Sequence, residues 1–151
     1  MITTAPRKEL ELDYSISEIK SAIERIAGQA NFGCRIVDKN DLFNTYKVTI
    51  IRNFVTGIMN ITLSNSVGKT HCLFEIINSV GGGAQPASLS NLQDYFLQLL
   101  SNSLTGNLEQ SIEAVENESK TSNNNLTKVL ISLIVIAIIC IAGYVYNANI
   151  R

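Results

Sequence analysis

Hydrophobic and polar residues alternate along much of the first hundred residues, and the period of the alternation identifies the elements. Between Lys8 and Tyr14, large apolar residues alternate with acidic ones, which predicts a strand with one buried face. The same period predicts four more strands, at Cys34–Asp38, Thr45–Arg52, Ile58–Leu63 and Thr70–Asn78. Short turns separate these four, including one near Asn53–Gly57, so they should form an antiparallel meander.

Apolar residues at three- and four-residue steps predict two helices. The first runs from about Ser17 to Gln29 and starts with a capping box, because Ser15 precedes Glu18 by three residues. Ser90 and Gln93 have the same spacing and predict the start of the second helix. Its apolar stripe comprises Leu92, Phe96, Leu99, Leu100, Ser103 and Leu104.

The order of these elements predicts an α+β fold. We expect an antiparallel five-stranded sheet with two helices packed on one face (β-α-β-β-β-β-α), followed by a linker and one transmembrane helix. The predicted parts are a soluble α+β domain at 1–104, an acidic and polar linker at 105–127 that is helical in part, a transmembrane helix at 128–146 and a short tail at 147–151.

The stretch from Val129 to Val145 has no charge, no proline and nothing more polar than Ser132. At about 1.5 Å per residue it spans roughly 26 Å as a helix, close to the thickness of a bilayer core. The alternative, a buried helix of a globular protein, requires a larger core than the rest of the chain supplies. The predicted interface anchors are Lys128, Tyr144 and Tyr146, and the predicted membrane-spanning residues are Val129, Leu130, Ile131, Leu133, Ile134, Val135, Ile136, Ile138, Ile139, Ile141 and Val145.

Charge and cysteine content bear on location. The formal net charge of −1 gives no electrostatic reason to bind nucleic acid. Residues 1–14 are rich in charge and lack the apolar core of a signal peptide, so the N-terminal domain is expected in the cytosol, at a membrane of the bacterial inner-membrane kind. Cys34, Cys72 and Cys140 are odd in number and include no close pair, which indicates free thiols.

Motifs that carry chemistry are incomplete. His71 and Cys72 are neighbours on a predicted strand and should point to opposite faces, so they cannot form a nucleophile and base pair. Gly68-Lys69-Thr70 lacks the earlier glycine of a phosphate loop and suits a hairpin turn. Asp38, Asn40 and Asp41 resemble the start of a calcium loop but are followed by Leu42 and Phe43. We therefore predict no catalytic, cofactor-binding or metal-binding residues, and no enzyme.

A further pattern extends from Leu12 to Gly106. It comprises Tyr14-Ser15 at the end of a strand, the helix Glu18 to Ile26, Cys34-Arg35-Ile36-Val37-Asp38, Gly57 before a strand, the strand Thr70 to Ile77 and a closing helix with Asn91 near its start. On these residues the segment resembles uncharacterised domains of small bacterial single-pass membrane proteins, with a TATA-binding-protein-like or shortened helix-grip arrangement. The resemblance implies no catalytic residues.

Together these features predict a tail-anchored, single-pass membrane protein. Its cytoplasmic domain would be a non-enzymatic module that binds a protein partner or a small apolar ligand, with the lipid bilayer as a further partner. Two alternatives are a nucleic-acid-binding module that uses the sheet and a tail-anchored protein of the trafficking type. The trafficking alternative needs a heptad-bearing segment before the anchor, and 105–127 is too short for one.

Overall fold

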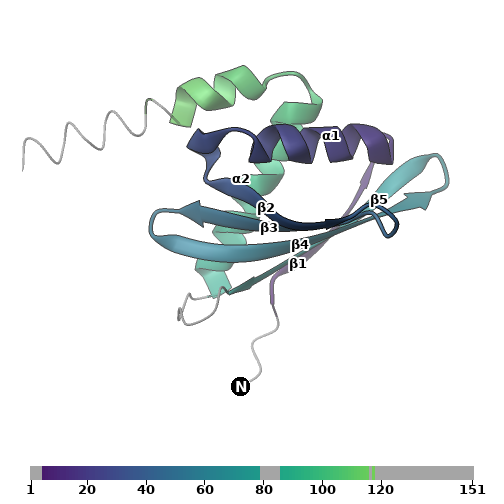
Figure 1. Cartoon of the computed structure of the whole chain (residues 1–151), viewed down its shortest axis with the longest axis horizontal. Coiled ribbons are helices and arrows are strands. Elements are labelled where there is room, and N and C mark those ends of the chain that lie inside the picture. Colours follow the sequence, from purple (N-terminus) through teal and green to yellow (C-terminus); the bar gives the residue numbers. More distant parts are fainter. Residues whose placement is uncertain (1–4, 79–85, 116, 118–151) are drawn as a thin grey trace, which may run out of the picture. The chain divides into compact units, whose positions relative to one another are not determined.

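Five antiparallel strands form one sheet in the order β1-β5-β4-β3-β2, and two helices cover one of its faces (Figure 1). The structure, a computed structural model, describes residues 5–78, 86–115 and 117. The two strands that flank the first helix in the chain lie at opposite edges of the sheet, so the helical segment between them connects those edges. The elements are β1 (Arg7–Leu12), α1 (Ile16–Ala27), the 3₁₀ helix η1 (Ala30–Phe32), β2 (Cys34–Asn40), β3 (Thr45–Arg52), β4 (Val55–Ser66), β5 (Lys69–Asn78) and α2 (Pro86–Leu104).

The core lies between the helices and one face of the sheet. On β3, Tyr46, Val48 and Ile50 are buried against the helices, whereas Lys47 and Ile51 are exposed on the other face. This alternation follows from the two-residue period of a strand. The other buried apolar residues of this layer include Ile19, Ala22, Ile23, Ile26, Met59, Ile61, Leu63, Cys72, Phe74, Ile76, Leu89, Leu92, Phe96, Leu99 and Leu100.

The turn between β3 and β4 is tighter than the sequence pattern predicted. Asn53 and Phe54 form a two-residue turn with φ of 50° and 64°, and the strand resumes at Val55. Gly57 is therefore not part of the turn but is buried inside β4. A Cβ atom at Gly57 would lie 2.8 Å from Cδ1 of Ile76 and 3.2 Å from Cδ1 of Leu92, so α2 packs directly on the sheet at this point.

One of the two predicted capping boxes is confirmed. The amide of Glu18 donates to Oγ of Ser15, and the amide of Ser15 donates to Oε2 of Glu18 at 2.8 Å. Hydrogen bonds from Ser15 also hold the pKa of Glu18 below its usual value. The second box is wrong, because α2 begins at Pro86, whose missing N–H costs nothing in a first helical turn. Gln93 is instead buried, and its Nε2 donates to the carbonyl of Phe74 at 3.0 Å.

The predicted membrane-spanning element is not found in the part of the chain that the structure describes. The helix α1 has 12 residues and is too short, and α2, with 19 residues, carries Gln93, Asp94 and Gln98. No helix within residues 5–78, 86–115 and 117 is long and apolar enough to cross a membrane. This finding overturns the predicted fold class as far as it included a transmembrane helix, and leaves an α+β fold with a five-stranded antiparallel sheet.

The residues on which the membrane prediction was based, 128–146 with Lys128, Tyr144 and Tyr146, lie outside the described residues. Cys140 lies outside them as well. Residues 108–115, within the predicted linker, are helical.

Candidate functional site

An apolar pocket of about 230 Å³ lies between the edge strand β1 and the C-terminal half of α2. We call it the β1–α2 pocket. One wall comes from the end of β1 and the residues that follow it, and the other from the last turns of α2. Its lining residues are Leu10, Leu12, Tyr14, Leu97, Leu100, Ser101, Leu104 and Thr105.

The register of β1 explains why leucines line this wall. Leu10 pairs with Cys72 and Leu12 pairs with Thr70, and both partners on β5 are buried on the helix-facing side. Leu10 points to the same side but is 37% exposed, whereas Cys72 is fully buried. The apolar face of β1 is therefore only partly covered by α2. The uncovered part forms the pocket.

Hydroxyl groups supply the polar atoms of the lining side chains. The Oγ1 of Thr105 donates to the carbonyl of Ser101 at 3.0 Å and is satisfied within the helix end. The hydroxyls of Tyr14 and Ser101 form no hydrogen bond within residues 5–78, 86–115 and 117. Each can therefore both donate to and accept from a bound molecule.

Ion pairs lie near both ends of the pocket wall. Lys8, two residues before Leu10 on the same face of β1, pairs with Asp94 of α2. Lys69 pairs with Asp13, next to Tyr14, with Nζ 3.2 Å from Oδ1. Neither lysine is a lining residue of the pocket. The pocket is therefore apolar and uncharged, although lysines are close to it.

A second, smaller pocket of about 180 Å³ lies near the other end of α2. Its lining is more polar and includes Arg52, Asn53, Ser88 and Asn91. The guanidinium of Arg52 stacks on the ring of Tyr95, with 4.1 Å between its central carbon and the ring centroid. The two pockets use the same helix but offer different chemistry, which makes the second one a useful control.

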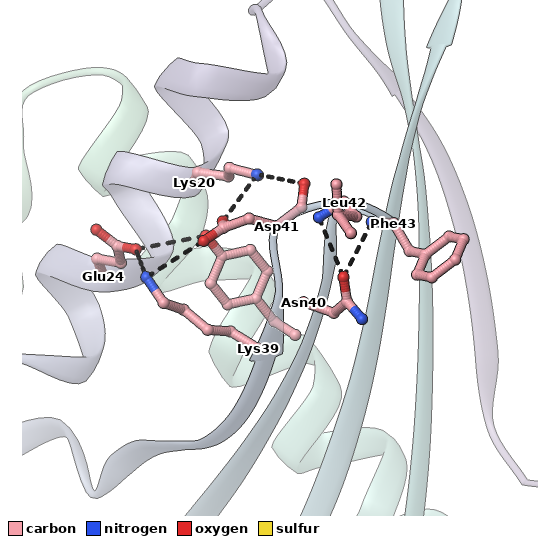
Figure 2. Close-up of polar contacts among 8 residues, drawn as sticks. Lys20, Glu24, Lys39, Asn40, Asp41, Leu42 and Phe43 are labelled. Carbon is pink, nitrogen blue, oxygen red and sulfur yellow. Dashed lines mark hydrogen bonds and ion pairs between the residues drawn. The ribbon is translucent and has the colours of Figure 1, made fainter.

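The opposite side of the helix layer is closed by polar contacts between α1 and the β2–β3 hairpin (Figure 2). We call Lys20, Glu24, Lys39, Asp41 and Tyr46 the hairpin cluster. The Nζ of Lys20 lies 3.0 Å from Oδ1 of Asp41, and Lys39 and the Tyr46 hydroxyl both donate to Oε1 of Glu24 at 3.4 Å. These contacts connect the hairpin to α1.

The hairpin cluster changes the pKa of two of its members. The hydrogen bond and the charge of Lys20, with the charge of Lys39, hold the pKa of Asp41 below its usual 3.8. Burial, aided by the carboxylate of Glu24, raises the pKa of Tyr46 to about 12. The tip of the same hairpin exposes Leu42 and Phe43, and Oδ1 of Asn40 accepts from both of their amides, at 3.0 and 3.2 Å. Asn40, the last residue of β2, thus stabilises the turn that follows it through its side chain, and Figure 2 shows these contacts.

The candidate chemical groups of the sequence do not converge. His71 lies on the outer face of β5, with Nε2 3.6 Å from a carboxylate oxygen of Glu9, whereas Cys72 is buried on the inner face. Cys34 and Cys72 are free thiols, as predicted, and burial raises their pKa to about 12 and about 11. No group of three or more metal-ligating side chains occurs among the residues that the structure describes.

Sequence reasoning missed the pocket. The predicted stripe of the second helix included Leu100 and Leu104 but omitted Leu97, which lies beside the stripe, and Leu10 and Leu12 were assigned to the core as ordinary strand residues. One signal for the pocket was present in the sequence. Lys8, Leu10 and Leu12 share one face of β1, so only two residues of that face are apolar. Sequence alone does not show how far α2 covers that surface.

Together, the described elements define an α+β domain in which the long helix α2 lies on an antiparallel sheet and leaves an apolar pocket beside an edge strand. Among solved structures the chain is similar to Ara h 8.0201, with a TM-score of 0.51, 10% sequence identity, and coverage of 70% of this chain and 97% of that one. It is also similar to a conserved protein from Geobacillus kaustophilus, with a TM-score of 0.46, 13% identity, and coverage of 70% and 95%. At such identities the first likeness shows a shared, Bet v 1-like fold.

No protein-family model and no curated protein matches the sequence. The predicted function and location are corrected by the same structural findings. A tail-anchored protein with its domain held at a membrane required a spanning helix, and none occurs among residues 5–78, 86–115 and 117. The functional assignment therefore depends on the folded domain.

Proposed function

We propose that the domain binds a small apolar ligand in the β1–α2 pocket and does not catalyse a reaction on it. The single observation that carries the proposal is an apolar pocket of about 230 Å³ between β1 and α2, with Tyr14 and Ser101 among its lining residues. Binding sites for small molecules are commonly concave, apolar and supplied with a few polar groups, usually over about 300–1,000 Å³. This pocket lies below that range, so the ligand should be smaller than a typical drug.

The energetics favour a ligand over an empty pocket. Leu10 is partly exposed, and each CH₂ group that a ligand removes from water here contributes about 0.8 kcal/mol. Binding without catalysis is supported by the absence of a convergent reactive group in the lining, which consists of aliphatic, tyrosine, serine and threonine side chains.

The test uses N-phenyl-1-naphthylamine, an uncharged dye whose fluorescence rises in apolar surroundings. We expect the domain to bind it and the variant Ser101→Phe, whose ring would occupy the pocket, to lose about tenfold or more in affinity. The matched control is Ser88→Phe, the same substitution on the same helix but in the second pocket. Equal binding by wild type, Ser101→Phe and Ser88→Phe would show that the dye binds elsewhere and would refute the proposal.

A further inference from the structure

We infer that the β1–α2 pocket selects uncharged ligands that carry one hydroxyl or carbonyl oxygen, such as a medium-chain alcohol, and that Asp94 determines this selectivity by holding Lys8. The inference rests on the proposed function, because it concerns the ligand of the same pocket. It begins with the lining, which contains no charged side chain. The hydroxyls of Tyr14 and Ser101 can pair with a neutral oxygen but cannot neutralise a carboxylate.

The position of Lys8 makes it the cation that a carboxylate ligand would need. Lys8 and Leu10 are two residues apart on the same face of β1, which separates them by about 7 Å along the strand. Lys8 therefore borders the pocket wall at Leu10. Among residues 7–12 it is the basic residue on the helix-facing side, since Arg7 points to the other face.

Asp94, on the α2 side of the pocket, forms an ion pair with Lys8. It lies three residues before Leu97 on α2, and residues at this spacing are neighbours on a helix surface. The ion pair between Lys8 and Asp94 thus joins the two walls beside the pocket. Its side chains are 37% and 56% exposed, so the pair is solvated and its removal does not leave a buried charge.

The consequence is a preference for neutral ligands. A carboxylate that enters the apolar pocket loses hydration and meets a lysine already bound to Asp94. An alcohol of the same length loses less hydration and finds the Tyr14 and Ser101 hydroxyls. Removing the Asp94 charge should release Lys8 from its ion pair. Lys8 can then pair with the ligand's carboxylate, and the affinity for the carboxylate ligand should rise.

The experiment measures displacement of N-phenyl-1-naphthylamine by 1-octanol and by octanoate at pH 7.5. Wild type should bind octanol about tenfold more tightly than octanoate. Asp94→Asn should tighten octanoate binding by about tenfold and change octanol binding by less than about twofold. Tyr14→Phe should weaken octanol binding by about threefold, because it removes one hydrogen bond.

Two controls separate this effect from a general change of surface charge. Asp13→Asn removes the carboxylate that pairs with Lys69 and should leave octanoate binding unchanged. Lys8→Met combined with Asp94→Asn should abolish the gain in octanoate affinity. If wild type prefers octanoate, or if Asp94→Asn and Asp13→Asn change octanoate binding equally, the selectivity mechanism is wrong, whereas the proposed binding of a ligand in the β1–α2 pocket is unaffected. If neither dye nor octanol binds, the proposed function and this inference fail together.

Discussion

Along α1 the helix layer is closed by the hairpin cluster, whereas along the C-terminal half of α2 the edge strand β1 leaves the β1–α2 pocket. Both regions combine a helix with an edge of the same sheet. At the α1 edge, polar side chains from the β2–β3 hairpin connect to the helix. At the β1 edge, the ion pair between Lys8 and Asp94 connects the strand to the helix, and leucines of β1 and α2 line the space beside it. The comparison shows that one edge of the sheet is joined to its helix by polar contacts, whereas the other edge leaves an apolar pocket beside its helix.

The largest expected difference between the two regions is the effect of shortening an apolar side chain. Ile23 of α1 is fully buried, so Ile23→Ala should lower the free energy of unfolding by about 3 kcal/mol. Leu97 is only partly buried and faces the pocket, so Leu97→Ala should lower it by about 1 kcal/mol. Urea denaturation monitored by circular dichroism measures both values. Equal losses would mean that the pocket is as well packed as the α1 side.

A smaller effect should appear at alkaline pH in the hairpin cluster. The pKa of Tyr46 is raised from 10.0 to about 12 in the folded state, so its contribution to stability is complete below pH 10 and is lost as the pH rises through 12. Wild type should lose on the order of 1–2 kcal/mol from this group over that interval. Tyr46→Phe should lack this part of the loss. Parallel stability curves for the two proteins between pH 9 and 12 would contradict the assignment.

The smallest effect concerns Asp41, which is exposed and therefore screened by solvent. Lys20 and Lys39 lower the pKa of Asp41, so its contribution is present above pH 3.8 and is lost as the pH falls through the lower folded-state value. Asp41→Asn should therefore be slightly less stable than wild type at pH 6, and the two should converge near pH 2. A difference in melting temperature that persists at pH 2 would show that the substitution acts through the turn rather than through charge.

Local pattern predicted most elements because burial on one face imposes a period. The alternation of Tyr46, Val48 and Ile50 and the spacing of Ser15 and Glu18 are examples, and both depend on residues close in the chain. The tight turn at Asn53 and Phe54 was missed because a phenylalanine in the left-handed region is unusual and sequence rules expect glycine there.

The pocket and its charges depend on contacts between distant segments. Lys8 and Asp94 are 86 residues apart in the chain, and no period connects them. The membrane prediction is corrected on a different ground. It required a spanning helix, and none occurs among residues 5–78, 86–115 and 117, whereas the described domain contains an apolar pocket.

Gly57 sets the geometry of α2. Its missing side chain lets Leu92 approach the sheet closely near the start of the helix, while the pocket lies toward the other end of the same helix, at Leu97 to Thr105. A methyl group at position 57 would press on Ile76 and Leu92, so an alanine there should displace α2 relative to the sheet. Because the same helix carries one wall of the β1–α2 pocket, we expect this substitution to alter the volume of the pocket although none of its lining residues has changed.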